Sequence, residues 1–466
     1  MRSKTHSAIW RCRHGLPRMI GNLLFVIGMF VISGVPAPAQ SPDAVRQILD
    51  RLDRLEAQNR ELLDEVHSLR DELAAARGNQ PATGPSVEER LEVQEARSAE
   101  QAQTKVEASQ RFPIRITGMA LFNTYLNSKG SGGREYPTIA VGGGTGSGGA
   151  TLRQSVIGLD YNGPRAIWGG RVSGSLRVDL FGGSGQPLDQ TVRLRTGMVG
   201  IEWKNRSLFA GVSKPIISPR EPDSLAQVGI SPLSGAGNLW MWVPQARFEQ
   251  DFRWGRGTGI KAQVGVIQTR EYDASPNSPY GEETSYYTPA RPGVEARLEL
   301  FSGSNRRIEI APGLHHSVSH VAGASVPSDI YSLDWFVRPW RPLEFTGAFF
   351  TGTNVSPLGT GGLRQGVILL APGRALGVRS LGGWGQVTYR VHPRLWFNVF
   401  SGQQDDRNSE LPPGSIGKNL LYGVNLFYRL APNVLASFET SQTRTNYISG
   451  GTLLNNHYDL ALAYLF

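Results

Sequence analysis

Residues 456–466 constrain the fold most strongly, because apolar side chains recur there at every second position. The alternate positions from 458 onward carry Tyr458, Leu460, Leu462, Tyr464 and Phe466, and the positions between them begin with a histidine and an aspartate. This period of two predicts a β-strand, since successive side chains of a strand point to opposite faces. An apolar face with aromatic ends suits the lipid-facing wall of a membrane barrel.

The same alternation recurs through residues 112–466. In the segment 166–181, Val172, Leu176 and Val178 alternate with Arg171, Arg177 and Asp179. We therefore expect an all-β membrane protein, a transmembrane antiparallel β-barrel of about 16 strands. The candidate strands are 112–126, 151–162, 166–181, 191–203, 206–213, 245–254, 258–270, 292–301, 306–318, 329–338, 342–351, 379–391, 394–401, 419–430, 433–445 and 456–466.

The links between these candidates alternate in length. Tight, turn-forming links follow the even-numbered strands, as at 162–164 and 204–205, whereas longer links follow the odd-numbered strands. The longer links include 127–150, 214–244, 271–291, 352–378 and 446–455. This predicts short periplasmic turns and long external loops, with both barrel termini at the periplasmic side. Whether the longest link, 214–244, folds into the lumen is open.

The N-terminal region predicts export. Residues 1–39 combine a basic start, an apolar run at 20–32 and small residues at 37–39, which indicates a signal peptide. The run is shorter than the roughly 20 residues of a spanning helix, although an uncleaved anchor is the alternative. The single cysteine, Cys12, precedes this run, so the mature chain is expected to have no thiol chemistry. A hydrophobic content of 39% still permits a barrel whose lumen is wet.

Residues 43–77 follow a heptad pattern over five repeats. The a positions hold Val45, Leu52, Asn59, Val66 and Leu73, and the d positions are also apolar. This predicts a coiled-coil oligomerisation helix, with dimer and trimer both open. A linker with a weaker helical pattern follows at 78–111, before the barrel at 112–466.

This layout resembles the trimeric porins of the DcaP-like, dicarboxylate-transporting type from Gram-negative outer membranes. The residues 151–160, TLRQSVIGLD, and the basic strand that begins with 191–195, TVRLR, are similar in plan to that family. The resemblance implies a homotrimer in the outer membrane, a coiled coil in the periplasm and passive uptake of small anionic solutes. It also implies that Phe466 is read by the barrel-assembly machinery.

A diffusion pore selects by lumen charge, and residues 112–466 carry nine more basic than acidic side chains. Adjacent strands lie about 4.8 Å apart, so arginines on neighbouring strands can form one basic wall that suits carboxylate or phosphate. The alternative is that Asp179, Glu202, Glu249 and Asp251 neutralise these bases and merely keep the lumen solvated. The candidate pathway residues are Arg153, Arg171, Arg177, Arg193, Arg195, Lys214 and Arg220.

Other chemistry is less well supported by the sequence. His315 and His316 are sequential in a strand and point to opposite faces, and His320 is expected in the next loop, so we predict no metal site. Ser317 and Ser319 lack a marked base and orienting group, so we predict no enzyme and no cofactor. The basic charge accompanies no nucleic-acid motif. We therefore expect a porin; the alternatives are a structural tether anchored by the barrel and an outer-membrane hydrolase.

Overall fold

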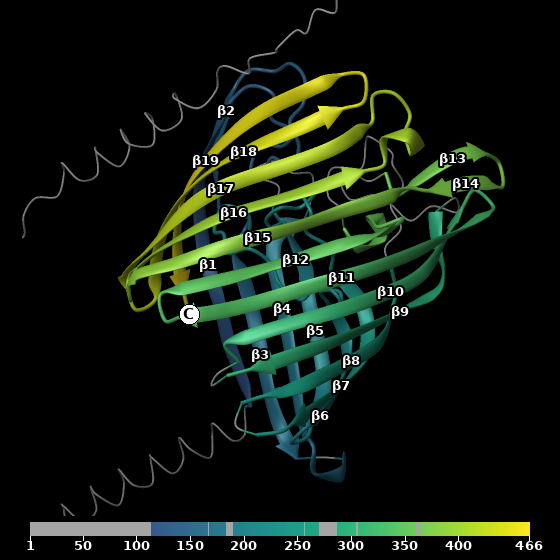
Figure 1. Cartoon of the computed structure of the whole chain (residues 1–466). Coiled ribbons are helices and arrows are strands. Elements are labelled where there is room, and N and C mark those ends of the chain that lie inside the picture. The colour runs from purple at the N-terminus through teal and green to yellow at the C-terminus, as the bar shows by residue number, and fades with distance from the viewer. Residues whose placement is uncertain are drawn as a thin grey trace, which may run out of the picture. The chain divides into compact units, whose positions relative to one another are not determined.

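The computed structural model describes residues 113–165, 167–182, 190–255, 257–269, 287–303, 306–359, 363 and 365–466. These residues form one closed antiparallel sheet (Figure 1). Short β2 and longer β3 both pair with β1 and together occupy one position in the wall, so the barrel has sixteen strand positions as predicted. None of the helices in the described ranges is long and apolar enough to cross a membrane.

The first half of the wall is formed by β1 (Ile114–Asn127), β2 (Ser147–Thr151), β3 (Val156–Arg165), β4 (Arg171–Gly182), β5 (Thr191–Glu202), β6 (Arg206–Ser213), β7 (Val243–Arg253), β8 (Gly259–Ile267) and β9 (Tyr287–Ser302). The second half is formed by β10 (Ile308–Val321), β11 (Ala324–Trp340), β12 (Leu343–Thr353), β15 (Arg379–His392), β16 (Leu395–Asp406), β17 (Ile416–Ala431), β18 (Val434–Tyr447) and β19 (Gly451–Leu465). A separate hairpin, β13 (Val367–Ala371) and β14 (Arg374–Gly377), was not predicted from the sequence.

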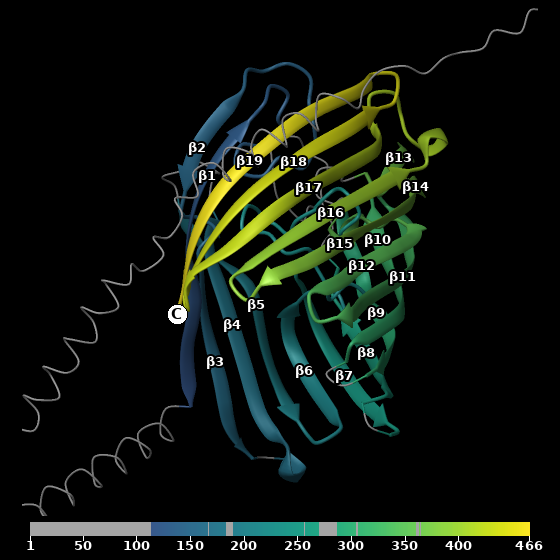
Figure 2. The same cartoon turned by 60° about the vertical axis from the view of Figure 1, so that its left-hand side comes forward.

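The barrel closes between its first and last strands, which lie side by side in Figure 2. Met119 is paired with Leu465 in this antiparallel register. Beyond it, Gly118 N donates to Phe466 O at 2.9 Å, and Phe466 N donates to Gly118 O at 3.1 Å. A Cβ at Gly118 would lie 2.5 Å from the Phe466 ring, so glycine leaves the space that this ring needs.

The predicted alternation of faces is confirmed. In β19 the side chains of Tyr458, Leu460 and Leu462 are exposed on the outer wall, whereas His457 and Asp459 are buried on the inner side. Because apolar side chains cover the outside, the wall suits a lipid environment.

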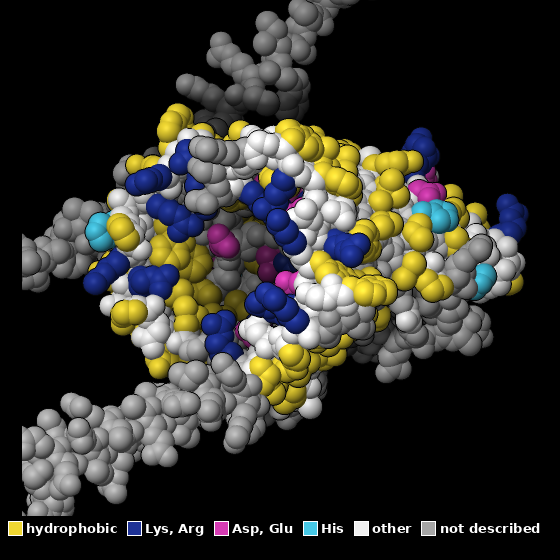
Figure 3. Space-filling model, turned by 90° about the horizontal axis from the view of Figure 1, so that it is seen from below, with side chains coloured by type: hydrophobic (Ala, Val, Ile, Leu, Met, Phe, Trp, Pro, Cys, Tyr) yellow, Lys and Arg dark blue, Asp and Glu magenta, His cyan; other side chains and the backbone are white. Residues whose placement is uncertain are grey.

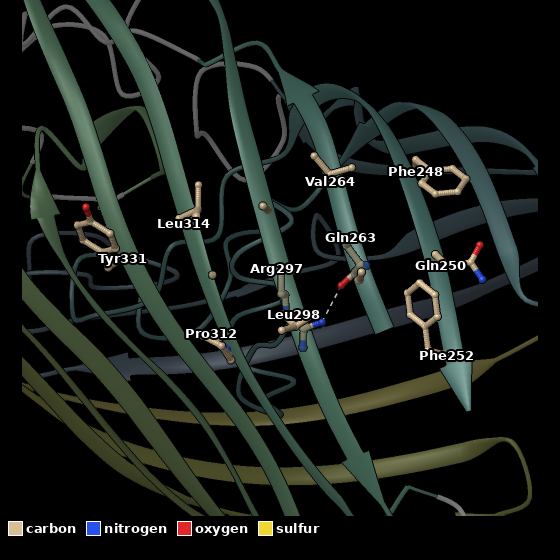
Figure 4. Close-up of a pocket in the computed structure, with 13 residues that line it drawn as sticks. Phe248, Gln250, Phe252, Gln263, Val264, Arg297, Leu298, Pro312, Leu314 and Tyr331 are labelled. Atoms are coloured by element: carbon tan, nitrogen blue, oxygen red, sulfur yellow. Dashed lines mark hydrogen bonds between the residues drawn. The ribbon is translucent and has the colours of Figure 1, made fainter. Parts of the chain in front are cut away.

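A hollow in the wall lies mainly on this apolar side. A groove of about 660 Å³ crosses β7 to β11 and is lined by the small side chains of Ala262 and Ala296 as well as by larger ones such as Phe248, Leu314 and Tyr331 (Figure 4). Most of its lining side chains alternate with the inward-facing ones. The groove therefore lies on the lipid-facing side and is not a route through the barrel.

The links at one end of the barrel, hereafter the short-turn end, are tight as predicted, and both barrel termini lie there. At the opposite, long-loop end, two links differ from the prediction. The expected long link 446–455 is a turn at 448–450, because β18 and β19 remain paired up to Tyr447 and Gly451. Likewise β10 and β11 extend to a turn at 322–323, so His320 lies in β10 and not in a loop.

The start of the expected strand 166–181 is also corrected. β4 begins only at Arg171, because Trp168 adopts a left-handed conformation (φ 53°) that interrupts an extended chain. The predicted signal peptide (1–39), coiled coil (43–77) and linker (78–111) lie outside the described residues.

Candidate functional site

The loop between β6 and β7, residues 214–242 and hereafter the inner loop, lies inside the barrel. Near its start, Ile216 N donates to Glu295 of β9 at 2.5 Å, and farther along Val228 O accepts from Arg195 of β5 at 2.6 Å. Its first half therefore follows the inner wall from strand to strand. The intermediate bonds join Ile217 to Ser332, Asp223 to Gln386, Ser224 to Glu439, Leu225 to Asn123 and Ala226 to Gln154.

The second half of the inner loop forms an apolar cluster within the lumen. Leu239, Trp240, Met241 and Trp242 are buried together with side chains from five wall strands. Their neighbours include Phe181 of β4, Ile267 of β8, Ile330 of β11 and Phe350 of β12. The lumen is thus partly filled by a dry core, and the inner loop narrows the space beside it.

Arg193 and Arg195, two of the predicted pathway residues, hold the inner loop. Both guanidinium groups contact the buried carboxylate of Asp179, at 2.7 and 3.0 Å. Arg193 also donates to Gly229 O, and both side chains stack on the Trp242 ring at about 5 Å. The pair brings two positive charges to one carboxylate, and its other donors are directed at loop carbonyl groups.

Arg153 is buried rather than open to the lumen. It lies in the turn between β2 and β3, contacts Glu135 at 3.3 Å and stacks on the Phe181 ring at 4.5 Å. The break between the two strands interrupts the alternation of faces, which explains the irregular parity at this point of the sequence. The neighbouring Gln154 lies in the same break and forms hydrogen bonds with Ala226 O and Val228 N of the inner loop.

Arg171 and Arg177 lie on the inner face of β4 near the short-turn end. Arg177 contacts Asp160 at 2.6 Å, and Arg115 approaches the same carboxylate at 3.8 Å. Arg171 is exposed and has no ion pair with any described residue. Of the predicted arginines it is the one whose charge faces water most openly.

Lys214 and Arg220 belong to the inner loop itself. Lys214 contacts Glu221 of the same loop at 2.6 Å, whereas Arg220 reaches the wall at Asp334 (2.8 Å) and Glu309 (2.5 Å). Six of the seven predicted bases are therefore ion-paired, and Arg193, Arg195 and Arg220 fasten the loop. The role of all seven in a solute pathway stays a prediction.

Basic side chains surround the inner face of the short-turn end, and sequence reasoning named only Arg171 and Arg177 among them. Figure 3 shows this opening, where basic side chains surround a hollow and acidic ones lie deeper. Glu344 of β12 illustrates the arrangement, since both Arg338 and Arg390 contact its carboxylate. A signal existed, because Arg390 lies between the outward-facing Tyr389 and Val391. This set, hereafter the arginine mouth, comprises Arg115, Arg171, Arg177, Arg253, Arg306, Arg338, Arg390 and Arg429.

The inner loop also presents acidic side chains to the open part of the lumen. Glu221 and Asp223 are both exposed there. Enclosure by the barrel raises the pKa of the Asp223 carboxyl above its ordinary 3.8, although the Gln386 amide donates to it and opposes that shift. The charge of Asp223 therefore responds to pH closer to neutrality than that of a free aspartate.

A hydrogen-bonded relay of three side chains lies in β9 and β10. His315 Nε2 is 2.8 Å from Ser317 Oγ, and its Nδ1 is 3.1 Å from Glu295. The sequence reasoning found no base or orienting group for Ser317, and the structure corrects this, since β-sheet pairing brings Glu295 opposite His315. All three side chains are at most 2% exposed, and Glu295 also accepts from Ile216 N of the inner loop. The relay supports that loop.

The histidines are separated as expected. His315 is buried on the inner side, while His316 is exposed on the outer side, 2.7 Å from Asp329. Within the described ranges, no three His, Cys, Asp or Glu side chains are grouped so that they could hold a metal ion.

No family model matches the chain, and no curated protein matches it either. Solved structures do match. The outer membrane channel DcaP of Acinetobacter baumannii superposes with a TM-score of 0.64 at 14% identity, covering 76% of this chain and 97% of that one. An anion-selective porin from Comamonas acidovorans superposes with a TM-score of 0.53 at 10% identity, covering 76% and 99%. The predicted resemblance to outer-membrane porins is thereby confirmed as a shared fold.

Proposed function

We propose that this chain is an outer-membrane porin for passive diffusion of small polar solutes, with a preference for anions that carry carboxylate or phosphate groups. The observation that carries the proposal is the arginine mouth, which surrounds the inner opening of a barrel with the porin fold. The Comamonas acidovorans protein, which has the same fold, is an anion-selective porin, and this supports the preference.

The charge arrangement gives a physical reason for the preference. Several inner carboxylates are shared by two bases: Asp160 by Arg115 and Arg177, Asp179 by Arg193 and Arg195, and Glu344 by Arg338 and Arg390. Each such group leaves one positive charge unbalanced. Low-dielectric walls concentrate this field in the lumen, which raises the local concentration of anions and lowers that of cations.

The setting of the pore is part of the proposal. The apolar outer wall supports a location in the outer membrane of a Gram-negative bacterium, with the short-turn end toward the periplasm. The predicted coiled coil at 43–77 would lie there and join the subunits of a homotrimer. Assembly by the barrel-assembly machinery would act on the closing strand β19 and Phe466.

Channel recording in a planar bilayer tests this proposal against the tether. The purified, folded protein should insert and give stepwise ohmic currents in KCl. A barrel whose folding is shown by circular dichroism and that inserts without any current would favour the tether anchored by its barrel.

The relay of Ser317, His315 and Glu295 favours a hydrolase as a second candidate, because it contains a nucleophile, a base and an orienting carboxylate. Burial argues against it. Ser317 is only 2% exposed and lies against Gly293, so a substrate carbonyl has no approach to its Oγ. We therefore assign the relay a structural role.

A further inference from the structure

Two carboxyl groups lie buried next to each other where the inner loop meets the wall. Glu439 of β18 and Asp459 of β19 are opposite one another in the antiparallel register, and each is 2% exposed. Directly opposed residues of neighbouring strands have Cβ atoms about 4.5–5.5 Å apart. The two acidic groups therefore share one small, dry site.

No base compensates these two carboxyl groups. Neither has an ion pair with Lys or Arg among the described residues, and one oxygen of Asp459, Oδ2, has no hydrogen-bond partner there. Of the other titratable groups on the packed elements, Asp223 of the inner loop adds negative charge, and His457 of β19 lies two residues from Asp459 on the same face. His457 Nδ1 is bonded to Asn127 at 2.8 Å, so this nitrogen is directed away from the carboxyl pair.

Two asparagines connect the carboxyl pair to the inner loop in the same manner. Asn425 Nδ2 donates to Asp223 O at 2.8 Å and to Glu439 at 2.9 Å. On the other side, Asn123 Nδ2 donates to Leu225 O at 2.8 Å and to Asp459 at 3.0 Å. Each amide thus bridges one loop carbonyl and one carboxyl group.

A direct bond lies between the two amide bridges. Ser224 Oγ donates to Glu439 at 2.6 Å, so loop residues 223–225 are held at three consecutive positions. The strands that supply these contacts, β17, β18, β19 and β1, are neighbours in the sheet (Figure 2). The position of the loop at this part of the wall therefore depends on the charge of Glu439 and Asp459.

We propose that Glu439 and Asp459 form a proton-dependent latch for the inner loop. Two like charges at this separation in a dry site cannot both persist, so the pair retains one shared proton while the loop is attached. When the pH rises, this proton passes to lumen water and both groups are charged. The segment 223–226 then leaves the wall, because water entering beneath it solvates the second charge. The pair thereby regulates how far the inner loop narrows the lumen. This inference rests on the proposed function only where it concerns the current through the pore.

Hydrogen exchange of the full-length protein in detergent tests the latch without any reference to transport. After correction for intrinsic rates, the protection of amides 223–229 should fall with rising pH by up to about tenfold per pH unit, as release of one proton requires. In Glu439→Gln the remaining carboxyl group, Asp459, no longer faces a second acidic side chain, so the transition should move to lower pH. Asp459→Asn provides the same test if the first variant does not fold.

Asp405→Asn is the matched control, because Asp405 pairs with Lys418 at 2.7 Å outside the latch, and it should behave as wild type. Equal pH dependence in wild type, Glu439→Gln and Asp459→Asn would overturn the proposal, as would pH-independent protection in wild type. Single-channel recording adds the functional readout: closures of wild type should become more frequent as pH rises, and in Glu439→Gln this increase should begin at lower pH. A protein that shows the exchange transition but conducts at no pH would contradict the porin and leave the latch supported.

Discussion

Arg195 Nη1 donates a hydrogen bond to the Val228 carbonyl oxygen at 2.6 Å, and this bond attaches the inner loop to β5. Arg195, which the sequence places on the lumen wall, thus positions the inner loop as well as contributing positive charge that attracts anions. The distinction matters for mutagenesis, because removal of such a side chain changes the shape of the pore as well as its charge.

Replacement of Arg195 by alanine should loosen the inner loop. It removes the hydrogen bond to Val228 O and the stacking on the Trp242 ring, while Arg193 still pairs with the buried Asp179. We expect larger open-channel current noise and faster proteolysis within 214–242. Arg171→Ala is the control, because this exposed arginine does not contact the loop; it should lower anion selectivity with no change in noise. Equal noise in both variants would contradict the positioning role.

Charge reversal at Arg390 should weaken the anion preference. At about 8 Å in water a unit charge acts on a passing ion with roughly 0.5 kcal/mol, so a change of two units corresponds to about a fivefold change in the permeability of each ion, in opposite directions for anions and cations. We expect Arg390→Glu to approach this value at low salt and much less at 1 M, where charges are screened. Reversal potentials at both salt concentrations measure it; a shift that is insensitive to salt would contradict an electrostatic mouth.

Acidification should increase anion selectivity through Asp223. Because enclosure raises the pKa of this carboxyl, it is negative above that pKa and becomes neutral as the pH falls through it. Loss of a negative charge at the constriction favours anions. Asp223→Asn should show the higher anion selectivity throughout the range from about pH 4 to about pH 7, and its selectivity should not change with pH in that range. A wild-type transition that persists in Asp223→Asn would assign it to another group.

Truncation of Trp242 should destabilise the barrel. Its ring is buried in the lumen core and stacks on Arg193 and Arg195, and Trp→Ala changes in cores typically cost about 3–5 kcal/mol. Urea unfolding in lipid vesicles measures the loss. Trp254→Ala is the control, because this side chain is 52% exposed, and its effect should be much smaller. Similar losses in the two variants would argue against a folded core inside the lumen.

Ser317 should be chemically silent. A fluorophosphonate probe should leave it unlabelled, and Ser317→Ala should keep the bilayer current while loosening the start of the inner loop at Ile216. Specific labelling that disappears in Ser317→Ala would instead support the hydrolase.

The barrel was predictable because strand alternation is local information. Tyr458, Leu460 and Leu462 of β19 face outward as the sequence indicates, and the count of sixteen follows from repeating this pattern. Strand lengths at the long-loop end were less predictable. There β18 and β19 extend beyond the apolar outer band, and their residues mix polar and apolar side chains without a clear alternation.

The interior was not predictable in the same way. The alternation of faces indicates that Arg193 points inward, but the sequence does not show that the carbonyl of Gly229, 36 residues later, will accept a hydrogen bond from it. The pairing of Glu439 with Asp459 and the relay through His315 likewise depend on register, which is set by the whole sheet. The arginine mouth could have been predicted by applying the alternation of faces to the strand residues next to the tight turns.

The reversal potential of the wild-type pore under a KCl gradient tests the central claim most directly. The account predicts that the potential lies toward the equilibrium value of chloride and moves toward zero when Arg338 and Arg390 are both replaced by glutamine. A potential on the potassium side, or one that the double variant leaves unchanged, would contradict the claim that the arginine mouth makes this barrel an anion-preferring pore.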